Sequence, residues 1–244
     1  MAKELKKAAV SKSKDVVAKK TAKKAGKKAA VKPAPKAVKK VAKKPASKKL
    51  KAPITPHVVE QAEVLSSEVV FQSATFRIVH DKLIEPGGKE NERDIIRHNG
   101  SAVILALDYT GSKKDPWVVM ERQYRHAANQ YLWELPAGKI EEGEDPVEGA
   151  QRELEEETGY HAKKWKPLVE FFASPGFLAE AMKVYLAEGL TVGAAHPEGD
   201  ESIEVRMVKL SDVLKMIEKG MIVDGKTLIS VLLFARQHKI KHGK

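Results

Sequence analysis

Between residues 65 and 98, hydrophobic and polar positions alternate with a period of two in short segments. This alternation is typical of half-buried strands, and it covers residues 65–71, 75–80 and 94–98. Short apolar runs that indicate further strands follow at 102–107, 117–121, 133–135, 168–173 and 182–187. The hydrophobic pattern therefore predicts a protein built largely from short strands.

Other segments show helical spacing instead. Apolar positions recur about every 3.6 residues over 146–158, 211–219 and 227–239. The first of these segments has well-marked ends, since Asp145 is suited to cap a helix and Gly159 to terminate one. Because strands precede, flank and follow this central helix, the sequence predicts a mixed α/β fold.

Charge divides the chain into two unlike parts. Residues 1–51 hold 20 of the 44 basic residues, all of them lysine, and only two of the 33 acidic residues, Glu4 and Asp15. This segment therefore carries a charge of about +18, while the remaining residues carry about −7. The net charge of +11 describes neither part, because a mildly acidic body follows a strongly basic arm.

The basic arm is expected to be disordered. Its residues are mostly Lys, Ala and Pro, aromatic residues are absent, and too little apolar surface is available to offset the entropy of ordering. Such charge density predicts non-specific binding to nucleic acid through phosphate contacts. A solubilising tail is the alternative.

Composition excludes several classes of protein. The chain has no cysteine, so disulfides and thiolate metal sites are ruled out. It has no apolar run of about 18 residues and no apolar segment after its basic start, so neither a membrane span nor a secretory signal is expected. We expect a cytoplasmic protein that associates with the nucleoid or chromatin if the arm binds nucleic acid.

The predicted helix over 146–158 gathers carboxylates on one side. Glu153, Glu156 and Glu157 are three and four residues apart and share one helical face. Like charges at this spacing repel, so the face is either solvated or neutralised by a cation. Clustered hard oxygen ligands suit Mg²⁺, with Mn²⁺ as a possible substitute.

The residue spacing around this helix decides between a solvated acidic face and a cation site. Gly138 is followed after five residues by Glu144, and after seven more by the run from Arg152 to Tyr160, which contains Gly159. This arrangement resembles the Nudix box of the Nudix hydrolases, with Tyr160 at a position that is often aliphatic. The resemblance implies an α/β/α sandwich over residues 99–240, preceded by a β-strand subdomain over 60–98.

Flanking stretches narrow the resemblance to the ADP-ribose pyrophosphatases. Residues 133–138 (WELPAG) and 122–125 (RQYR) are similar to the approach to the box in that subgroup. Ser174-Pro175-Gly176-Phe177 leads to Glu180, like the acidic loop of these enzymes. Ala179 stands where that loop usually has Asp. The resemblance covers residues 65–236 and excludes the arm.

The resemblance implies a set of metal ligands. These are the side chains of Glu153, Glu156 and Glu157 and the carbonyl oxygen of Ala137. Arg152 would orient the glutamates through charge-assisted hydrogen bonds. Glu144 is expected to be structural rather than a ligand. The implied reaction is Mg²⁺-dependent hydrolysis of the pyrophosphate bond of ADP-ribose, or of a related nucleoside diphosphate sugar, with AMP and ribose 5-phosphate as the products from ADP-ribose.

Three further residues are candidates for catalysis or substrate binding. Glu180 is the first choice for the general base, because a loop carboxylate could close over substrate. Arg125 is expected to contact a substrate phosphate or the terminal ribose. Arg122 is a second candidate for substrate binding, although strand alternation puts it on the face opposite Arg125. The histidines at 80, 98 and 126 show no metal-ligand spacing.

Two alternatives to ADP-ribose hydrolysis stay open. The same chemistry could act on a GDP-sugar or a dinucleoside polyphosphate. The chain could instead be a nucleic-acid-binding protein in which catalysis is secondary. The subgroup also implies a homodimer, with residues 60–98 as the dimerisation unit.

Overall fold

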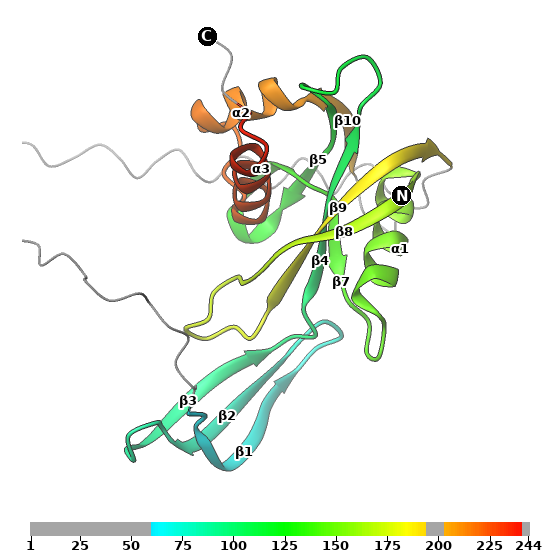
Figure 1. Ribbon diagram of the computed structural model, residues 1–244. Coiled ribbons are helices and arrows are strands. Elements are labelled where there is room, and N and C mark those ends of the chain that lie inside the picture. Colours follow the sequence, from blue (N-terminus) through cyan, green and yellow to red (C-terminus); the bar gives the residue numbers. More distant parts are fainter. Residues whose placement is uncertain (1–59, 194–202, 241–244) are drawn as a thin grey trace, which may run out of the picture. The chain divides into compact units, whose positions relative to one another are not determined.

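The computed structural model describes residues 60–193 and 203–240 (Figure 1). The predicted basic tail at residues 1–51 lies outside the described residues. Within the described part, no helix is both long and apolar enough to cross a membrane.

The first sheet is a three-stranded antiparallel meander. Its strands are β1 (Glu63–Gln72), β2 (Arg77–Ile84) and β3 (Glu90–Arg97), in spatial order β1-β2-β3. Val79 and Leu83 of the central strand are buried, whereas every residue of β1 is exposed. The meander therefore presents β1 as an uncovered edge strand.

The second sheet has seven strands, which lie between residues 101 and 209. Their bounds are β4 Ser101–Asp108, β5 Trp117–Arg125, β6 Gln130–Glu134, β7 Ala137–Lys139, β8 Tyr160–Phe172, β9 Ala181–Val192 and β10 Glu204–Lys209. The main path runs β10-β5-β4-β9-β8, with β6 paired to β5 and β7 to β4. A 3-10 turn, His126–Ala128, joins β5 to β6. Strands β4 and β9 are parallel, and the remaining neighbours are antiparallel.

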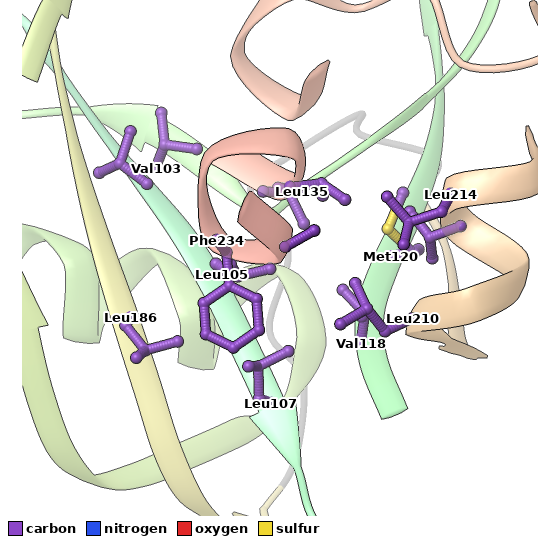
Figure 2. Close-up of a cluster of buried hydrophobic side chains, with 14 of the residues drawn as sticks. Val103, Leu105, Leu107, Val118, Met120, Leu135, Leu186, Leu210, Leu214 and Phe234 are labelled. Carbon is purple, nitrogen blue, oxygen red and sulfur yellow. The ribbon is translucent and has the colours of Figure 1, made fainter. Parts of the chain in front are cut away.

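Helices cover both faces of this sheet, as Figure 1 shows. The helix α1 (Pro146–Thr158) packs on one face, and α2 (Leu210–Glu218) and α3 (Gly225–Gln237) pack on the other. Alternate residues of β4 belong to two hydrophobic cores, one on each face of the sheet. Figure 2 shows the larger core, in which Val103, Leu105 and Leu107 meet Leu210, Leu214 and Phe234 of the helices. The predicted α/β/α sandwich is confirmed.

The α1 helix has the predicted ends. The Asp145 side chain accepts a hydrogen bond from the Val147 amide at 2.8 Å, and Gly159 terminates the helix with φ 70°. Ala150 and Leu154, on the apolar face of this helix, are fully buried. The helix is therefore fixed at both ends and along its apolar face, which holds its acidic face in place.

The prediction for β8 was too short. Only residues 168–173 were expected to form a strand, but β8 runs from Tyr160 to Phe172. Its first half contains several lysines and Pro167, which obscure the alternation. Such residues suit an edge strand, and β8 is the edge of the sheet, with a bulge between Pro167 and Val169.

Candidate active site

A cavity of about 480 Å³ opens beside α1. It brings together the predicted groups from distant parts of the sequence. The lining residues include Arg125, Ala137, Arg152, Glu153, Glu156, Glu157 and Glu180. All of the predicted catalytic and metal-binding residues therefore share one cavity, as does one of the two predicted substrate-binding arginines.

Arg152 organises the acidic face of α1. Its Nη1 donates to Glu153 Oε1 at 2.8 Å and to Glu156 Oε2 at 2.9 Å. Its Nε donates to Glu144 Oε1 at 3.0 Å, and its Nη2 to the carbonyl oxygen of Lys139, also at 3.0 Å. The Arg152 hydrogen bond lowers the pKa of the Glu144 carboxyl. One guanidinium thus orients three carboxylates and ties the helix to β7.

Two glycines, Gly138 of the motif and Gly149 of α1, lie close to these carboxylates. A Cβ atom on Gly138 would lie 1.9 Å from Cδ of Glu153, far inside van der Waals contact. A Cβ on Gly149 would lie 2.9 Å from Oε2 of Glu144. Side chains at either position would displace the acidic groups that Arg152 holds.

Glu157 forms the buried end of the acidic face. Its Oε2 accepts a hydrogen bond from the Ala137 amide at 3.0 Å, and its carboxyl hydrogen-bonds with that of Glu121 on β5. Burial raises the pKa of Glu121 to about 8, although the bond to Glu157 opposes the shift. Sequence reasoning missed Glu121, because it lies within an ordinary apolar strand pattern.

This donor set fits a hard divalent cation. Glu153, Glu156 and Glu157 would supply carboxylate oxygens, and Ala137, the first residue of β7, lines the same cavity. Glu121 Oε1 is buried without a hydrogen-bond partner among residues 60–193 and 203–240. In that same part of the chain, no three acidic or histidine side chains are gathered closely enough to form a cage for a metal. Carboxylate oxygens are the donors that Mg²⁺ prefers, and Mg²⁺ usually keeps several of its waters when bound.

Two cationic side chains, Arg125 and Lys226, also line the cavity. Arg125 donates from Nε and Nη2 to the two oxygens of Glu134, at 2.9 and 2.8 Å. The Lys226 ammonium contacts the same carboxylate from the start of α3. Burial alone would raise the pKa of Glu134, but the hydrogen bond from Arg125 and the charge of Lys226 lower it overall. Lys226 Nζ also lies 3.2 Å from Asp224 Oδ1, so Glu134 and Asp224 together hold these two cations in the cavity lining.

Lys226 was not predicted as a site residue. The predicted helical segment begins only at residue 227, whereas α3 begins at Gly225 and includes Lys226. The Thr227 hydroxyl accepts a hydrogen bond from the Leu135 amide at 2.9 Å, which anchors this helix start beside β6. The placement of Lys226 thus depends on a contact between segments about 90 residues apart, which spacing does not reveal.

Glu180 enters the cavity from the loop between β8 and β9. Its Oε1 accepts a hydrogen bond from the Ser101 hydroxyl at 2.6 Å, and His98 Nδ1 lies 4.0 Å from the same atom. Both Ser101 and His98 line the cavity, and neither was predicted. His98 lies in the turn before β4 and Ser101 is the first residue of β4, so only the fold brings them to Glu180.

Arg122 is placed differently from Arg125. Its Nη1 lies 3.5 Å from Glu204 Oε2, and its guanidinium carbon lies 4.9 Å from the centre of the Tyr131 ring. Among the described residues it is not part of the cavity lining. Strand alternation accounts for the separation, because Arg122 and Arg125 project from opposite faces of β5.

Comparison with known proteins agrees with this geometry. The family model of the NUDIX domain matches residues 98–228. An ADP-ribose pyrophosphatase from Bacillus subtilis is 36% identical over 173 residues, covering 70% of this chain and 91% of that protein. One from Mycobacterium tuberculosis is 37% identical over 175 residues, covering 70% and 81%.

A methanol dehydrogenase activator from Bacillus methanolicus is also similar. It is 35% identical over 184 residues, covering 75% of this chain and 97% of that protein. Among solved structures, an ADP compounds hydrolase superposes with a TM-score of 0.63 at 19% identity, covering 75% of this chain and 97% of that one. This structural likeness shows a shared fold.

Proposed function

The chain belongs to the Nudix family, and on that premise we propose that it hydrolyses the pyrophosphate bond of ADP-ribose in a Mg²⁺-dependent reaction. The products would be AMP and ribose 5-phosphate. The observation that supports the proposal is the cavity itself, because its lining combines the acidic face of α1, the cations Arg125 and Lys226, and a loop carboxylate, Glu180.

The acidic face would hold the metal. Glu153, Glu156 and Glu157, with the carbonyl oxygen of Ala137, are the proposed ligands. When bound, Mg²⁺ would supply charge neutralisation at the pyrophosphate and a more acidic water. Arg152 would keep the carboxylates aligned through the hydrogen bonds described above.

The remaining residues would bind substrate and move a proton. Arg125 and Lys226 offer positive charge at the cavity wall, where a diphosphate would find complementary groups. Glu180 would accept the proton of the attacking water as the general base. Substrate binding by Arg122 would require this side chain to turn away from Glu204, and it stays a prediction.

The direct test is hydrolysis of ADP-ribose with and without Mg²⁺, followed by phosphate release through a coupled phosphatase. Wild type should turn over only with the metal. Glu157→Gln should lower kcat by at least about 10²-fold, because it removes a charged ligand. Glu155→Gln is the matched control, since Glu155 lies on the same helix but is exposed and outside the cavity lining.

The substrate has to be identified with a panel of compounds, because two relatives of similar identity are named for different functions. GDP-sugars and dinucleoside polyphosphates should be tested beside ADP-ribose. Preference for one of these compounds would keep the chemistry and change the substrate. Absence of metal-dependent turnover with every compound would contradict the proposed function.

We also propose that the chain forms a homodimer through residues 60–98. The support is the uncovered β1 strand, where Val64, Leu65, Val69, Val70 and Phe71 are each at least half exposed. Apolar side chains in a row on an edge strand are unusual for a surface that meets only water.

A second proposed partner is nucleic acid, through residues 1–51. The support is the charge of the sequence, about +18 over this segment. Nucleic-acid binding would be a second function beside hydrolysis, and it would use none of the residues that line the cavity.

A further inference from the structure

We propose that Ser101 is a positioning residue that holds the Glu180 carboxylate in its working orientation. The inference rests on the proposed function, in which Glu180 is the general base. Its starting observation is the hydrogen bond from the Ser101 hydroxyl to Glu180 Oε1, at 2.6 Å. A hydrogen bond from a hydroxyl to a carboxylate is short and strong when the acceptor is ionised.

The sheet itself sets the place of Ser101. As the first residue of β4, it pairs with Met182 of the parallel strand β9 and with Lys139 of β7. Met182 is only two residues beyond Glu180. Ser101 is 8% exposed, so its hydroxyl is held within the sheet rather than on a mobile surface. The register of two neighbouring strands therefore delivers a hydroxyl beside the loop carboxylate.

The backbone around Glu180 is anchored separately. The Ala173 amide donates to the Glu180 carbonyl oxygen at 3.0 Å and closes the loop. The Ala179 amide donates to the Ile96 carbonyl oxygen at 2.9 Å, which ties the loop to β3. These bonds fix the main chain but leave the side-chain torsions of Glu180 undetermined. In the described part of the chain, the hydroxyl of Ser101 is the group that hydrogen-bonds to the Glu180 carboxylate.

The turn before β4 is shaped for this contact. Gly100 has φ 94°, and a Cβ there would lie 2.9 Å from the Ala181 carbonyl oxygen. A side chain would push the turn away from the residue that follows Glu180. Nδ1 of His98 accepts a hydrogen bond from the Gly100 amide at 3.0 Å and lies too far from Glu180 for a hydrogen bond of its own.

The hydrogen bond distinguishes the two oxygens of Glu180. Oε1 is engaged by Ser101, whereas no group in the described ranges 60–193 and 203–240 donates a hydrogen bond to Oε2. Oε2 is then the atom that would accept a proton from water. Loss of the Ser101 hydroxyl would let the carboxylate rotate, so the base would be misaligned while the substrate-binding cations stayed in place.

The kinetic test compares Ser101→Ala with Glu180→Gln and with the double variant. Ser101→Ala should lower kcat by about tenfold with KM nearly unchanged, because it misplaces the base without removing it. In the Glu180→Gln background, the same change should have no further effect. Ser211→Ala is the matched control, since it removes another hydroxyl–carboxylate hydrogen bond, to Asp115 at 3.1 Å, outside the cavity lining.

A structural test is independent of turnover. Crystal structures of wild type and Ser101→Ala, grown in the same conditions, should show Glu180 in a fixed orientation only when the hydroxyl is present. An unchanged Glu180 side chain in the variant would overturn the inference, as would a kcat within twofold of wild type or a full additional loss in the double variant. If wild type hydrolyses no substrate, the proposed function fails, and the crystal comparison still decides the role of Ser101.

Discussion

At the scale of single residues, Gly138 shows how little space separates the backbone from the acidic face. Gly138→Ala would place a methyl group on the Glu153 carboxylate, so we expect the metal site to be displaced. Activity should fall by at least about 10²-fold, since small misplacements of catalytic groups have effects of that size. Steady-state kinetics across a range of Mg²⁺ concentrations would measure this loss.

The control for this substitution is Gly225→Ala. Apart from its chain neighbours and the backbone of its own helix, no atom of residues 60–193 and 203–240 lies within 4 Å of a Cβ at Gly225, the first residue of α3. The variant should keep full activity. Full activity of Gly138→Ala at ordinary Mg²⁺ would show that the carboxylate adjusts without functional loss, and would argue against Glu153 as a ligand.

The loop carboxylate provides a second prediction. Glu180→Gln keeps the shape of the side chain but removes its basicity, so kcat should fall by at least about 10²-fold. Glu170→Gln, an exposed glutamate on β8, should have no effect. Hydrolysis of ADP-ribose by the two variants checks this, and a fall of less than about tenfold would move the role of base to the helix.

The residues of the site differ in how far the sequence reveals them. Glu153, Glu156 and Glu157 lie on one helix, so their spacing alone places them on one face. Ser101 and Glu121 come from separate strands and have no local signature. They meet Glu180 and Glu157 only through the pairing of the sheet, which is a long-range property.

At the scale of elements, the hairpin of β2 and β3 contains a cross-strand pair of titratable groups. His80 and Asp94 face each other in the register, with His80 Nδ1 2.8 Å from Asp94 Oδ1. The hydrogen bond to Asp94 raises the pKa of His80. The stabilisation is therefore fully present below the ordinary His pKa of about 6.5, and it is lost as pH rises through the raised value.

The raised pKa of His80 leads to a prediction about stability and pH. Asp94→Asn should lower the melting temperature more at about pH 5.5 than at about pH 8.5, because only protonated His80 gains from the carboxylate. Thermal melts at both pH values measure the difference. Glu90→Gln, at the start of the same strand, should show no such dependence. Equal destabilisation at the two pH values would show that the pair contributes only a neutral hydrogen bond.

The elements themselves were predictable where local chemistry determines them. The α1 helix has a capping aspartate, a proline in its first turn and a terminal glycine, and its predicted bounds are those observed. Strand β4 was recognised as a buried apolar run. The early part of β8 was missed, because a strand at the edge of a sheet tolerates lysine and proline and so loses its alternation.

At the scale of the whole molecule, the exposed β1 strand predicts association. A stable dimer buries about 800 Å² on each partner, and the apolar side chains of β1 provide a surface for it. Val70→Lys should convert the dimer to a monomer at micromolar concentration, as measured by light scattering. Val192→Lys places the same charge on an exposed valine of the other sheet and should leave the dimer intact. A wild-type protein that is monomeric at this concentration would contradict the proposed homodimer.

Charge divides the molecule along the sequence, which predicts separate sites for the two proposed functions. Residues 1–51 carry about +18, whereas the remainder is acidic overall and would by itself be repelled by nucleic acid. The full chain should therefore bind DNA with an affinity that falls by about 10³-fold between about 50 and 200 mM salt, if about six lysines contact phosphate. Fluorescence anisotropy with labelled DNA measures this slope.

Deletion of residues 1–51 should abolish this binding and leave hydrolysis of ADP-ribose unchanged, because every described cavity residue lies beyond the segment. Glu157→Gln is the reciprocal control: it should lose hydrolysis and bind DNA with the same salt slope as wild type. DNA binding that survives the deletion would place the nucleic-acid contact on the folded body. Hydrolysis that falls with the deletion would show that the basic segment also serves the active site, so the two functions would be coupled rather than joined only by the chain.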